Sequence, residues 1–167
     1  MGNPNILALR YAKDGIKNLY SEEGKVRLER DLWLAVLKAE KEFGVDIPAE
    51  QIDRFERAID DIDLNLIRQI ELVTRHDVKA RIQAYVQAAG AQELIHKPLT
   101  SRDATDNVEQ MQIKLAAGII RDKCISVARH FADRASDYQY IELTARTHHQ
   151  PAQPTLLGRR MTTWAEE

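Results

Sequence analysis

Three histidines lie in polar junctions between apolar stretches of the chain. His76, His96 and His148 each stand close to a hydroxyl, a carboxylate or an arginine. A histidine titrates near neutrality, so it can give or take a proton at working pH. Three of them at helix starts and loops could supply general acid catalysis and contacts to an anion. Any one of them alone is more typical of a solvated loop, so the interpretation depends on the flanking residues.

The first two junctions combine these residues with signals for a helix start. Thr74 to Asp77 reads Thr-Arg-His-Asp and precedes a helical repeat of apolar residues, and Thr100 to Asp103 has the Thr-x-x-Asp form of a capping box. Unpaired amides and the helix dipole favour bound anions at such starts. The two junctions therefore predict a ligand site. Capping by Asp77, and by Thr100 with Asp103, is the structural alternative.

The third junction, residues 145–155, is the most specific string in the chain. It reads Ala-Arg-Thr-His-His-Gln-Pro-Ala-Gln-Pro-Thr, which a purely structural loop rarely requires. The adjacent His148 and His149 could suggest a metal, but neighbouring side chains seldom converge on one ion, and no HExxH motif or cysteine cluster completes a site. The sequence therefore predicts no metal and no cofactor, and it indicates no role for His130.

Helical spacing of apolar residues predicts an all-α fold. Ser21 is suited to cap a helix, and Gly44 and Gly90 are suited to end two others. Residues 138–148 suit a short extended segment or a loop, and the prolines that follow break any helix there. The expected helices cover residues 21–44, 48 to about 60, 64 onward, 76–90, 100 to about 135, and 155 onward.

The helix expected from Thr100 is much longer than is usual in globular proteins. Its apolar stripe continues for roughly nine turns, to about Ala135. Such a helix needs partners along its whole length, which indicates a bundle and further subunits. We expect an N-terminal helical domain, residues 1–98, followed by the first part of a central helical-bundle domain, residues 99–167.

Composition narrows the possible partners and the compartment. The formal net charge of -2 predicts neither a nucleic acid partner nor an anionic membrane surface. No run approaches the roughly 20 apolar residues of a membrane helix, and the N-terminus lacks the apolar core of a signal peptide. The single Cys124 cannot form an internal disulfide, which favours a reducing compartment, the cytoplasm. Its apolar neighbours predict a small core thiol.

The three junctions together resemble the fumarase/aspartase superfamily and, within it, the adenylosuccinate lyase family. Residues 146–160 look like the first signature region of the superfamily, and residues 96–107 are similar to the second. Arg-His-Asp-Val at residues 75–78 and the pair Arg10-Tyr11 resemble segments typical of adenylosuccinate lyases. The resemblance spans nearly the whole chain and implies a helical fold of that superfamily.

The resemblance also implies a role for each matched residue. Arg10 and Tyr11 would contact a nucleotide, and His96 would orient the substrate. His148 would serve as general acid to the departing nitrogen, with Thr147 beside it at the scissile C–N bond. The remaining implied positions are Arg75, the catalytic His76 and Asp77 in the substrate pocket, and Thr100 and Ser101 at a substrate carboxylate.

The reaction implied is a β-elimination in purine nucleotide biosynthesis. It cleaves adenylosuccinate to AMP and fumarate, and the succinylated ribotide SAICAR to AICAR and fumarate. Sites of this family are shared between subunits of a homotetramer. The serine that removes the proton lies in a glycine- and serine-rich loop, which the resemblance places beyond residue 167. The chain is therefore expected to be an N-terminal fragment, inactive alone.

Three alternatives stay open. Carboxymuconate cycloisomerase-like members share a similar Thr-His-x-Gln-Pro-Ala-Gln string, and an argininosuccinate lyase-like enzyme would keep the elimination but change the substrate; Arg10-Tyr11 argues against both. Pro98, where the family usually has Gly, and His149, at a variable position, depart from the pattern but remove no chemical group. The third alternative is a non-catalytic helical oligomerisation module whose histidines merely cap helices.

Overall fold

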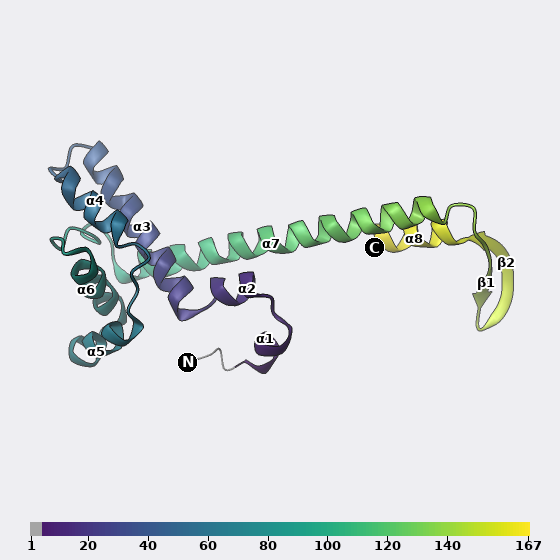
Figure 1. The fold of residues 1–167 in the computed structure, drawn as a ribbon, viewed down its shortest axis with the longest axis horizontal. Coiled ribbons are helices and arrows are strands. Elements are labelled where there is room, and N and C mark those ends of the chain that lie inside the picture. The colour runs from purple at the N-terminus through teal and green to yellow at the C-terminus, as the bar shows by residue number, and fades with distance from the viewer. Residues whose placement is uncertain (1–4) are drawn as a thin grey trace. The chain divides into compact units, whose positions relative to one another are not determined.

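The computed structural model describes residues 5–167, which fold into helices and one small hairpin (Figure 1). This confirms the predicted all-α fold class. The elements are α1 (Ile6–Tyr11), α2 (Asp14–Leu19), α3 (Glu22–Glu42), α4 (Ala49–Arg57), α5 (Leu64–Thr74), α6 (Asp77–Ala89), α7 (Ser101–Asp137), β1 (Glu142–Thr147), β2 (Gln150–Leu156) and α8 (Leu157–Glu166).

The described chain divides into two compact units, one ending at Ala116 and the other formed by Ala117–Glu167. Helix α7 runs through the boundary, so its first turns belong to unit 1 and its later turns to unit 2. The expected domain boundary between residues 98 and 99 stays a prediction, because a compact unit and a domain are defined differently.

Local signals position the helix ends in unit 1. The Ser21 side chain accepts a hydrogen bond from the Gly24 amide at 3.0 Å and so begins α3. Asp63 caps α5 by accepting from the amides of Asn65 and Leu66. Gly90 ends α6 with a left-handed backbone, φ 55°, which glycine adopts without strain. The boundaries at Ser21 and Gly90 confirm the predicted ones, whereas the cap at Asp63 was not predicted, although a helix from residue 64 was.

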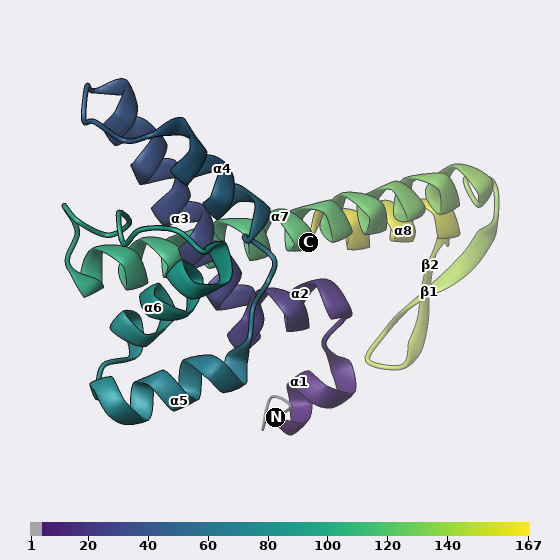
Figure 2. The same cartoon turned by 60° about the vertical axis from the view of Figure 1, so that its left-hand side comes forward.

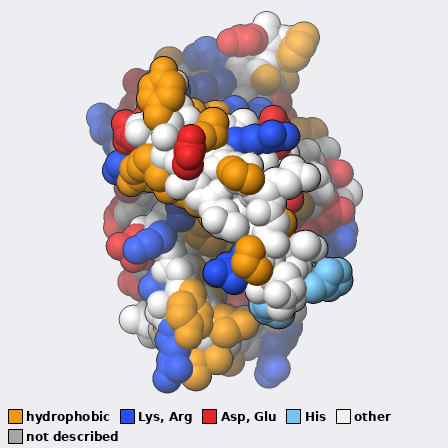
Figure 3. Space-filling view, turned by 90° about the vertical axis from the view of Figure 1, so that its right-hand side faces the viewer, with side chains coloured by type: hydrophobic (Ala, Val, Ile, Leu, Met, Phe, Trp, Pro, Cys, Tyr) orange, Lys and Arg blue, Asp and Glu red, His pale blue; other side chains and the backbone are white. Residues whose placement is uncertain are grey.

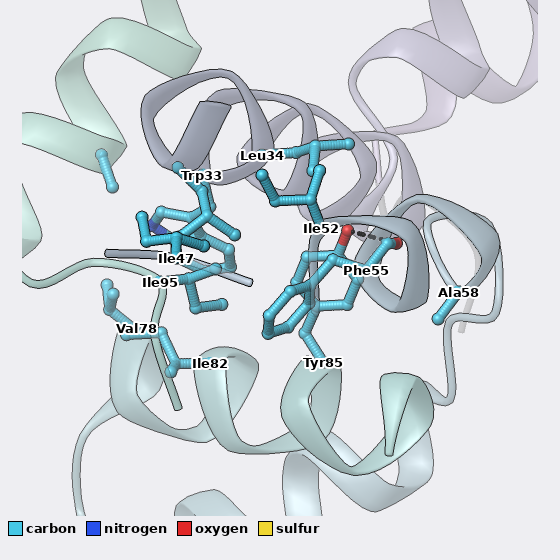
Figure 4. Packing of buried hydrophobic residues seen from close by; sticks show 12 residues of the cluster. Trp33, Leu34, Ile47, Ile52, Phe55, Ala58, Val78, Ile82, Tyr85 and Ile95 are labelled. Atoms are coloured by element: carbon cyan, nitrogen blue, oxygen red, sulfur yellow. Dashed lines mark hydrogen bonds between the residues drawn. The ribbon is translucent and has the colours of Figure 1, made fainter. Parts of the chain in front are cut away.

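The main core of unit 1 lies between α3, α4 and α6 (Figure 4). The rings of Phe55 and Tyr85 meet edge to face with centroids 4.9 Å apart, and the Tyr85 hydroxyl donates to the Phe55 carbonyl at 2.8 Å. Burial raises the pKa of Tyr85 to about 12, so its hydroxyl stays protonated. The buried members are Trp33, Leu34, Leu37, Ile47, Ile52, Phe55, Ala58, Val78, Ile82, Tyr85, Ile95 and Ala104.

A second, smaller core holds α5 beside α6, and the two helices lie side by side in both views (Figures 1 and 2). Its buried members are Val26 of α3, Ile67 of α5, and Ala80 and Ala84 of α6. The alanines allow the backbones to approach closely, because they carry only a methyl group. The start of α6 is therefore fixed from two sides, by both cores.

Unit 2 consists of the later turns of α7, the hairpin and α8. The strands pair antiparallel, with Glu142 opposite Leu156, and the register is irregular between Thr144 and Arg146. Helix α8 returns along α7, and the Phe131 and Trp164 rings stand with centroids 6.5 Å apart. A Cβ at Gly158 would lie 2.4 Å from the Ala135 carbonyl oxygen, so this close approach requires glycine.

Three features of the fold differ from the sequence expectations. Helices α1 and α2 were not predicted, because six residues are too few to establish a helical period. The extended segment near residue 142 was predicted, but its pairing with the proline-containing β2 was not. Cys124 is exposed on α7, which corrects the expected core thiol. Cys124 lines a hollow of about 330 Å³ together with Phe131 and Trp164.

Beyond its first turns, α7 leaves its apolar side chains open. Five of them, with exposed fractions between 43% and 56%, are Ile113, Leu115, Ile120, Ile125 and Val127. Leu115 and Val127 belong to the predicted apolar stripe whose length indicated further partners. Within residues 5–167, no helix has both the length and the apolar character that crossing a membrane requires.

We predict that Phe55→Ala lowers the free energy of unfolding by about 3–5 kcal/mol, because it empties a fully buried site. The matched control is Phe43→Ala, whose side chain is 90% exposed and should change stability by less than about 0.5 kcal/mol. Urea unfolding followed by circular dichroism measures both. Similar losses in the two variants would contradict the core described above.

Candidate functional site

The first predicted junction forms the start of α6. His76 is the N-cap residue, and its Nδ1 atom accepts a hydrogen bond from the Lys79 amide at 3.4 Å. The N-cap is therefore His76 and not Asp77, which is the first helical residue and whose carboxylate also binds Arg81. Arg75 precedes the cap in a left-handed conformation, φ 55°.

The second junction meets the first. The Ser101 hydroxyl oxygen lies 3.3 Å from Nε2 of His76, so the starts of α6 and α7 come together. Since Nδ1 of His76 accepts from a backbone amide, the neutral ring donates through Nε2 to this hydroxyl. The Thr100 amide donates to the Asp103 carboxylate at 2.8 Å, which is the backbone half of the predicted capping box.

A chain of charged groups links this junction to the interior. Glu29 of α3 is fully buried and forms an ion pair with Arg81 of α6, whose second Nη atom binds Asp77. Desolvation raises the pKa of Glu29, against the opposing charge of Arg81. Partial burial also acts to raise the pKa of Asp77, but the hydrogen bond from the Val78 amide and the charge of Arg81 outweigh it and lower that pKa. Asp77 therefore stays ionised beside His76.

His96 belongs to the loop between α6 and α7. Its Nδ1 atom accepts a hydrogen bond from the indole nitrogen of the buried Trp33 at 3.1 Å. Burial lowers the pKa of His96, with Asp103 acting in the opposite direction. The loop thus brings a second histidine to the same unit as His76 and Ser101.

Left-handed backbone is concentrated in the three junctions. Among residues 5–167, the non-glycine residues with positive φ are Arg75, His96, His148 and His149. This conformation costs a non-glycine residue roughly 1–2 kcal/mol. Such strain persists only where the surroundings enforce it, and it gathers at functional sites. The first and third junctions, and the loop that carries His96, therefore contain the strained positions of the described backbone.

The third junction forms the tip of the hairpin in unit 2. Thr147 ends β1, Gln150 begins β2, and His148 and His149 form the two-residue turn, with φ values of 48° and 66°. Positive φ at both positions is typical of a type I′ turn, which matches the twist of the strands. Both histidines are exposed, and Figure 3 shows histidine side chains standing at the surface of the face it draws. The sequence predicted a short extended segment or a loop here, and the structure shows a hairpin that exposes His148 at its tip.

Arg10 and Tyr11 lie on α1, and both are exposed, Tyr11 by 73%. In the described part of the chain, no hydrogen bond or ion pair joins either of them to another candidate residue. The structure therefore brings together Arg75, His76, Asp77, His96, Thr100 and Ser101 within unit 1. It presents Thr147 and His148 separately on unit 2, and Arg10 and Tyr11 separately on α1.

The geometry indicates a site for an oxygen-rich anion. Two helix starts, two hydroxyls and the imidazole of His76 can hold a carboxylate, and Arg75 adds a cation near the same helix start. Among residues 5–167, no three or more His, Cys, Asp and Glu side chains gather as a metal site would require.

Sequence reasoning missed Glu29, Arg81 and Trp33 as supports of the site. A signal was present: Val26, Glu29 and Trp33 share one helical face at spacings of three and four. A carboxylate on an otherwise apolar face predicts a buried, paired group, and that pair leads to Asp77.

Comparison with known proteins supports one family throughout the chain. The sequence model of the family described as "Lyase" matches residues 12–167, a range that begins just after Tyr11. The chain is 34% identical to adenylosuccinate lyase of Schistosoma mansoni over 164 residues, covering 98% of this chain and 34% of that protein. It is 32% identical to adenylosuccinate lyase of Saccharomyces cerevisiae, covering 96% of this chain and 34% of that protein.

A solved structure supports the fold independently. The β-carboxy-cis,cis-muconate cycloisomerase of Acinetobacter calcoaceticus superposes with a TM-score of 0.73 at 22% identity, covering 97% of this chain and 39% of that chain. At this identity the likeness concerns the fold alone. The chain spans about a third of the length of the curated relatives it matches.

We predict opposite pH dependences for two carboxylate substitutions. The raised pKa of Glu29 means that its contribution to stability is present below its unfolded pKa, about 4.3, and is lost as pH rises through the folded pKa. Glu29→Gln removes this loss. The free energy of unfolding of the variant should therefore rise relative to that of the wild type as pH rises above about 4.

The matched control for this prediction is Glu50→Gln. The hydrogen bond from Arg54 lowers the pKa of Glu50, so its contribution is present above the unfolded pKa and is lost in acid. The free energy of unfolding of Glu50→Gln should therefore fall relative to that of the wild type as pH rises. Denaturant unfolding at a series of pH values measures both trends, and trends of the same sign would refute the buried state of Glu29.

Proposed function

The chain belongs to the lyase family of the fumarase/aspartase superfamily, and from this premise we propose that the protein cleaves adenylosuccinate to AMP and fumarate. The same elimination would convert SAICAR to AICAR and fumarate, because both substrates carry a succinyl group on nitrogen. The matched relatives are about three times as long as the matched segment, and the proposal concerns a protein of that length.

The observation that carries the proposal is the contact between Nε2 of His76 and the Ser101 hydroxyl. It joins the starts of α6 and α7, where unpaired amides and short hydroxyls can receive a carboxylate without a buried cation. We assign the succinyl group to this place, with Thr100 and Ser101 at one carboxylate and His76 beside it. Arg75 and Asp77, which flank His76, would contact the same group.

The chemistry follows from where charge develops. Removal of a proton next to a carboxylate builds negative charge on that group, so fixed donors at Thr100 and Ser101 would stabilise the transition state. The nitrogen leaving group must gain a proton, and His148 would donate it from the hairpin tip, with Thr147 alongside. Arg10 and Tyr11 would hold the nucleotide, the guanidinium pairing with its phosphate. The proton-abstracting serine remains assigned by resemblance to a loop outside these residues.

We propose that the complete site is assembled between copies in a homotetramer. The exposed apolar side chains of α7 support this, because a helix with an uncovered stripe requires partners along that stripe. A copy that contributes its hairpin to the junction of another copy would bring His148 to the substrate. A cytoplasmic location stays a prediction.

Two other functions are distinguished by substrate and by turnover. A cycloisomerase of the carboxymuconate type shares the fold, but the curated sequence relatives that match at 28% to 34% identity carry the name adenylosuccinate lyase. A non-catalytic assembly module, in which His76 merely caps α6, is distinguished by the absence of turnover.

We predict that the full-length protein containing this sequence converts adenylosuccinate to AMP, followed by the absorbance change of the purine. His148→Ala should lower kcat by about 10²- to 10⁴-fold, because the departing nitrogen loses its general acid. The matched control is His130→Ala, an exposed histidine on α7 with no assigned role, which should keep wild-type turnover.

The outcomes separate the alternatives. Turnover of a carboxymuconate in place of adenylosuccinate would identify the cycloisomerase function. Absence of turnover with every substrate would favour the assembly module. An unchanged kcat in His148→Ala would remove the role assigned to the hairpin tip while leaving the reaction in place.

A further inference from the structure

The hydrogen bond between Trp33 and His96 restricts the chemistry of His96. An indole N–H can only donate, so the Nδ1 atom that receives it at 3.1 Å must be unprotonated. The single proton of the neutral ring then resides on Nε2. Protonation of Nδ1 would place two N–H groups against each other and remove the bond. Trp33 therefore selects both the tautomer and the charge of His96.

The surroundings hold both partners in place. Trp33 is fully buried in the main core, and Ile95, the residue before His96, is buried in the same core. His96 itself has a left-handed backbone, φ 67°, which turns its side chain away from the regular path of the chain. The two rings stand edge to face at 85° with centroids 6.0 Å apart. The imidazole is thus fixed by its backbone on one side and by the indole on the other.

The charged and titratable groups around His96 act in both directions. Burial lowers its pKa, and His76 and Lys79 act in the same direction, while Asp103 acts to raise the pKa. The lowering groups prevail, so the ring remains neutral at neutral pH. None of residues 5–167 forms a hydrogen bond with Nε2, and the side chain is only half-buried. The Nε2–H group is therefore available to a ligand.

We propose that Trp33 is a positioning residue that holds His96 as the neutral Nε2–H tautomer, so that His96 offers a hydrogen-bond donor to a substrate oxygen. This rests on the proposed function, because it takes the substrate to bind at the junctions of unit 1. His96 then binds and orients, and does not exchange protons. Proton transfer then belongs to His148 at the hairpin tip, whose ring is not held by an indole in this way.

The tautomer is tested directly by nitrogen NMR on the full chain with ¹⁵N-labelled histidine. At neutral pH we expect Nδ1 of His96 to give the signal of an unprotonated nitrogen and Nε2 that of a protonated one. Trp33→Phe keeps an aromatic ring but removes the donor, so His96 should populate both tautomers and accept a proton at higher pH than in the wild type. The matched control, Trp164→Phe, lies in unit 2 and should leave the His96 signals unchanged.

A wild-type His96 with its proton on Nδ1, or on both nitrogens, overturns the proposal. This result does not depend on turnover, so it is distinct from a failure of the proposed function. If Trp33→Phe fails to fold, as shown by loss of the circular dichroism of the wild type, the wild-type spectrum and the variants at position 96 still decide the matter.

The role as a donor is tested by two substitutions of His96 in the assay of the full-length protein. His96→Gln places a neutral amide N–H close to the position of Nε2, whereas His96→Leu removes the donor at similar size. We expect kcat/KM to fall about 10²-fold in His96→Leu and less than about tenfold in His96→Gln, with similar pH profiles for Gln and wild type. Equal losses in both variants, or no loss in His96→Leu, would overturn the proposal.

Discussion

The buried face of α3 carries Glu29 and Trp33. Through their polar atoms, these two side chains connect the core of unit 1 with the candidate site. Glu29 binds Arg81, which binds Asp77 at the first junction. Trp33, one helical turn along, binds His96 in the loop before the second junction. One helix face therefore sets the positions of two histidine-bearing segments that are distant in sequence.

This arrangement explains why polar groups persist in the interior. A buried ion pair rarely adds net stability, because desolvation of both charges offsets their attraction. Arg30, also fully buried on this face, donates to the carbonyls of Ala58 and Asp61 at 2.6 Å and 2.8 Å and stacks over Tyr85. It closes the end of α4 and needs no further role. The Glu29–Arg81 pair does not serve a helix end in this way. The orientation of Asp77 by Arg81 explains the pair better.

Capping residues and the helical spacing of apolar residues predicted most of the helices, because both signals involve residues close together in the chain. Ser21, Asp63 and Gly90 act through neighbours within four residues, and the helices they bound were predicted. The contact of His76 with Ser101, and that of Trp33 with His96, join positions far apart, and no local pattern contains them. The resemblance to a family indicated candidate residues at the junctions but could not indicate the residues that support them. The left-handed turn at His148 was not predicted either, because His-His is not one of the Asn-Gly or Asp-Gly pairs that signal such a turn, although histidine adopts positive φ more often than most residues.

The hairpin poses a different physical problem, since both strands of a two-stranded sheet are edges. An open edge invites a strand from another molecule, because its amide hydrogens and carbonyls are ready for pairing. Pro151 and Pro154 remove two amide hydrogens from β2, so an incoming strand would meet an interrupted row of donors. The two prolines therefore make β2 a poorer template for strand addition, so a partner would contact the hairpin through its side chains.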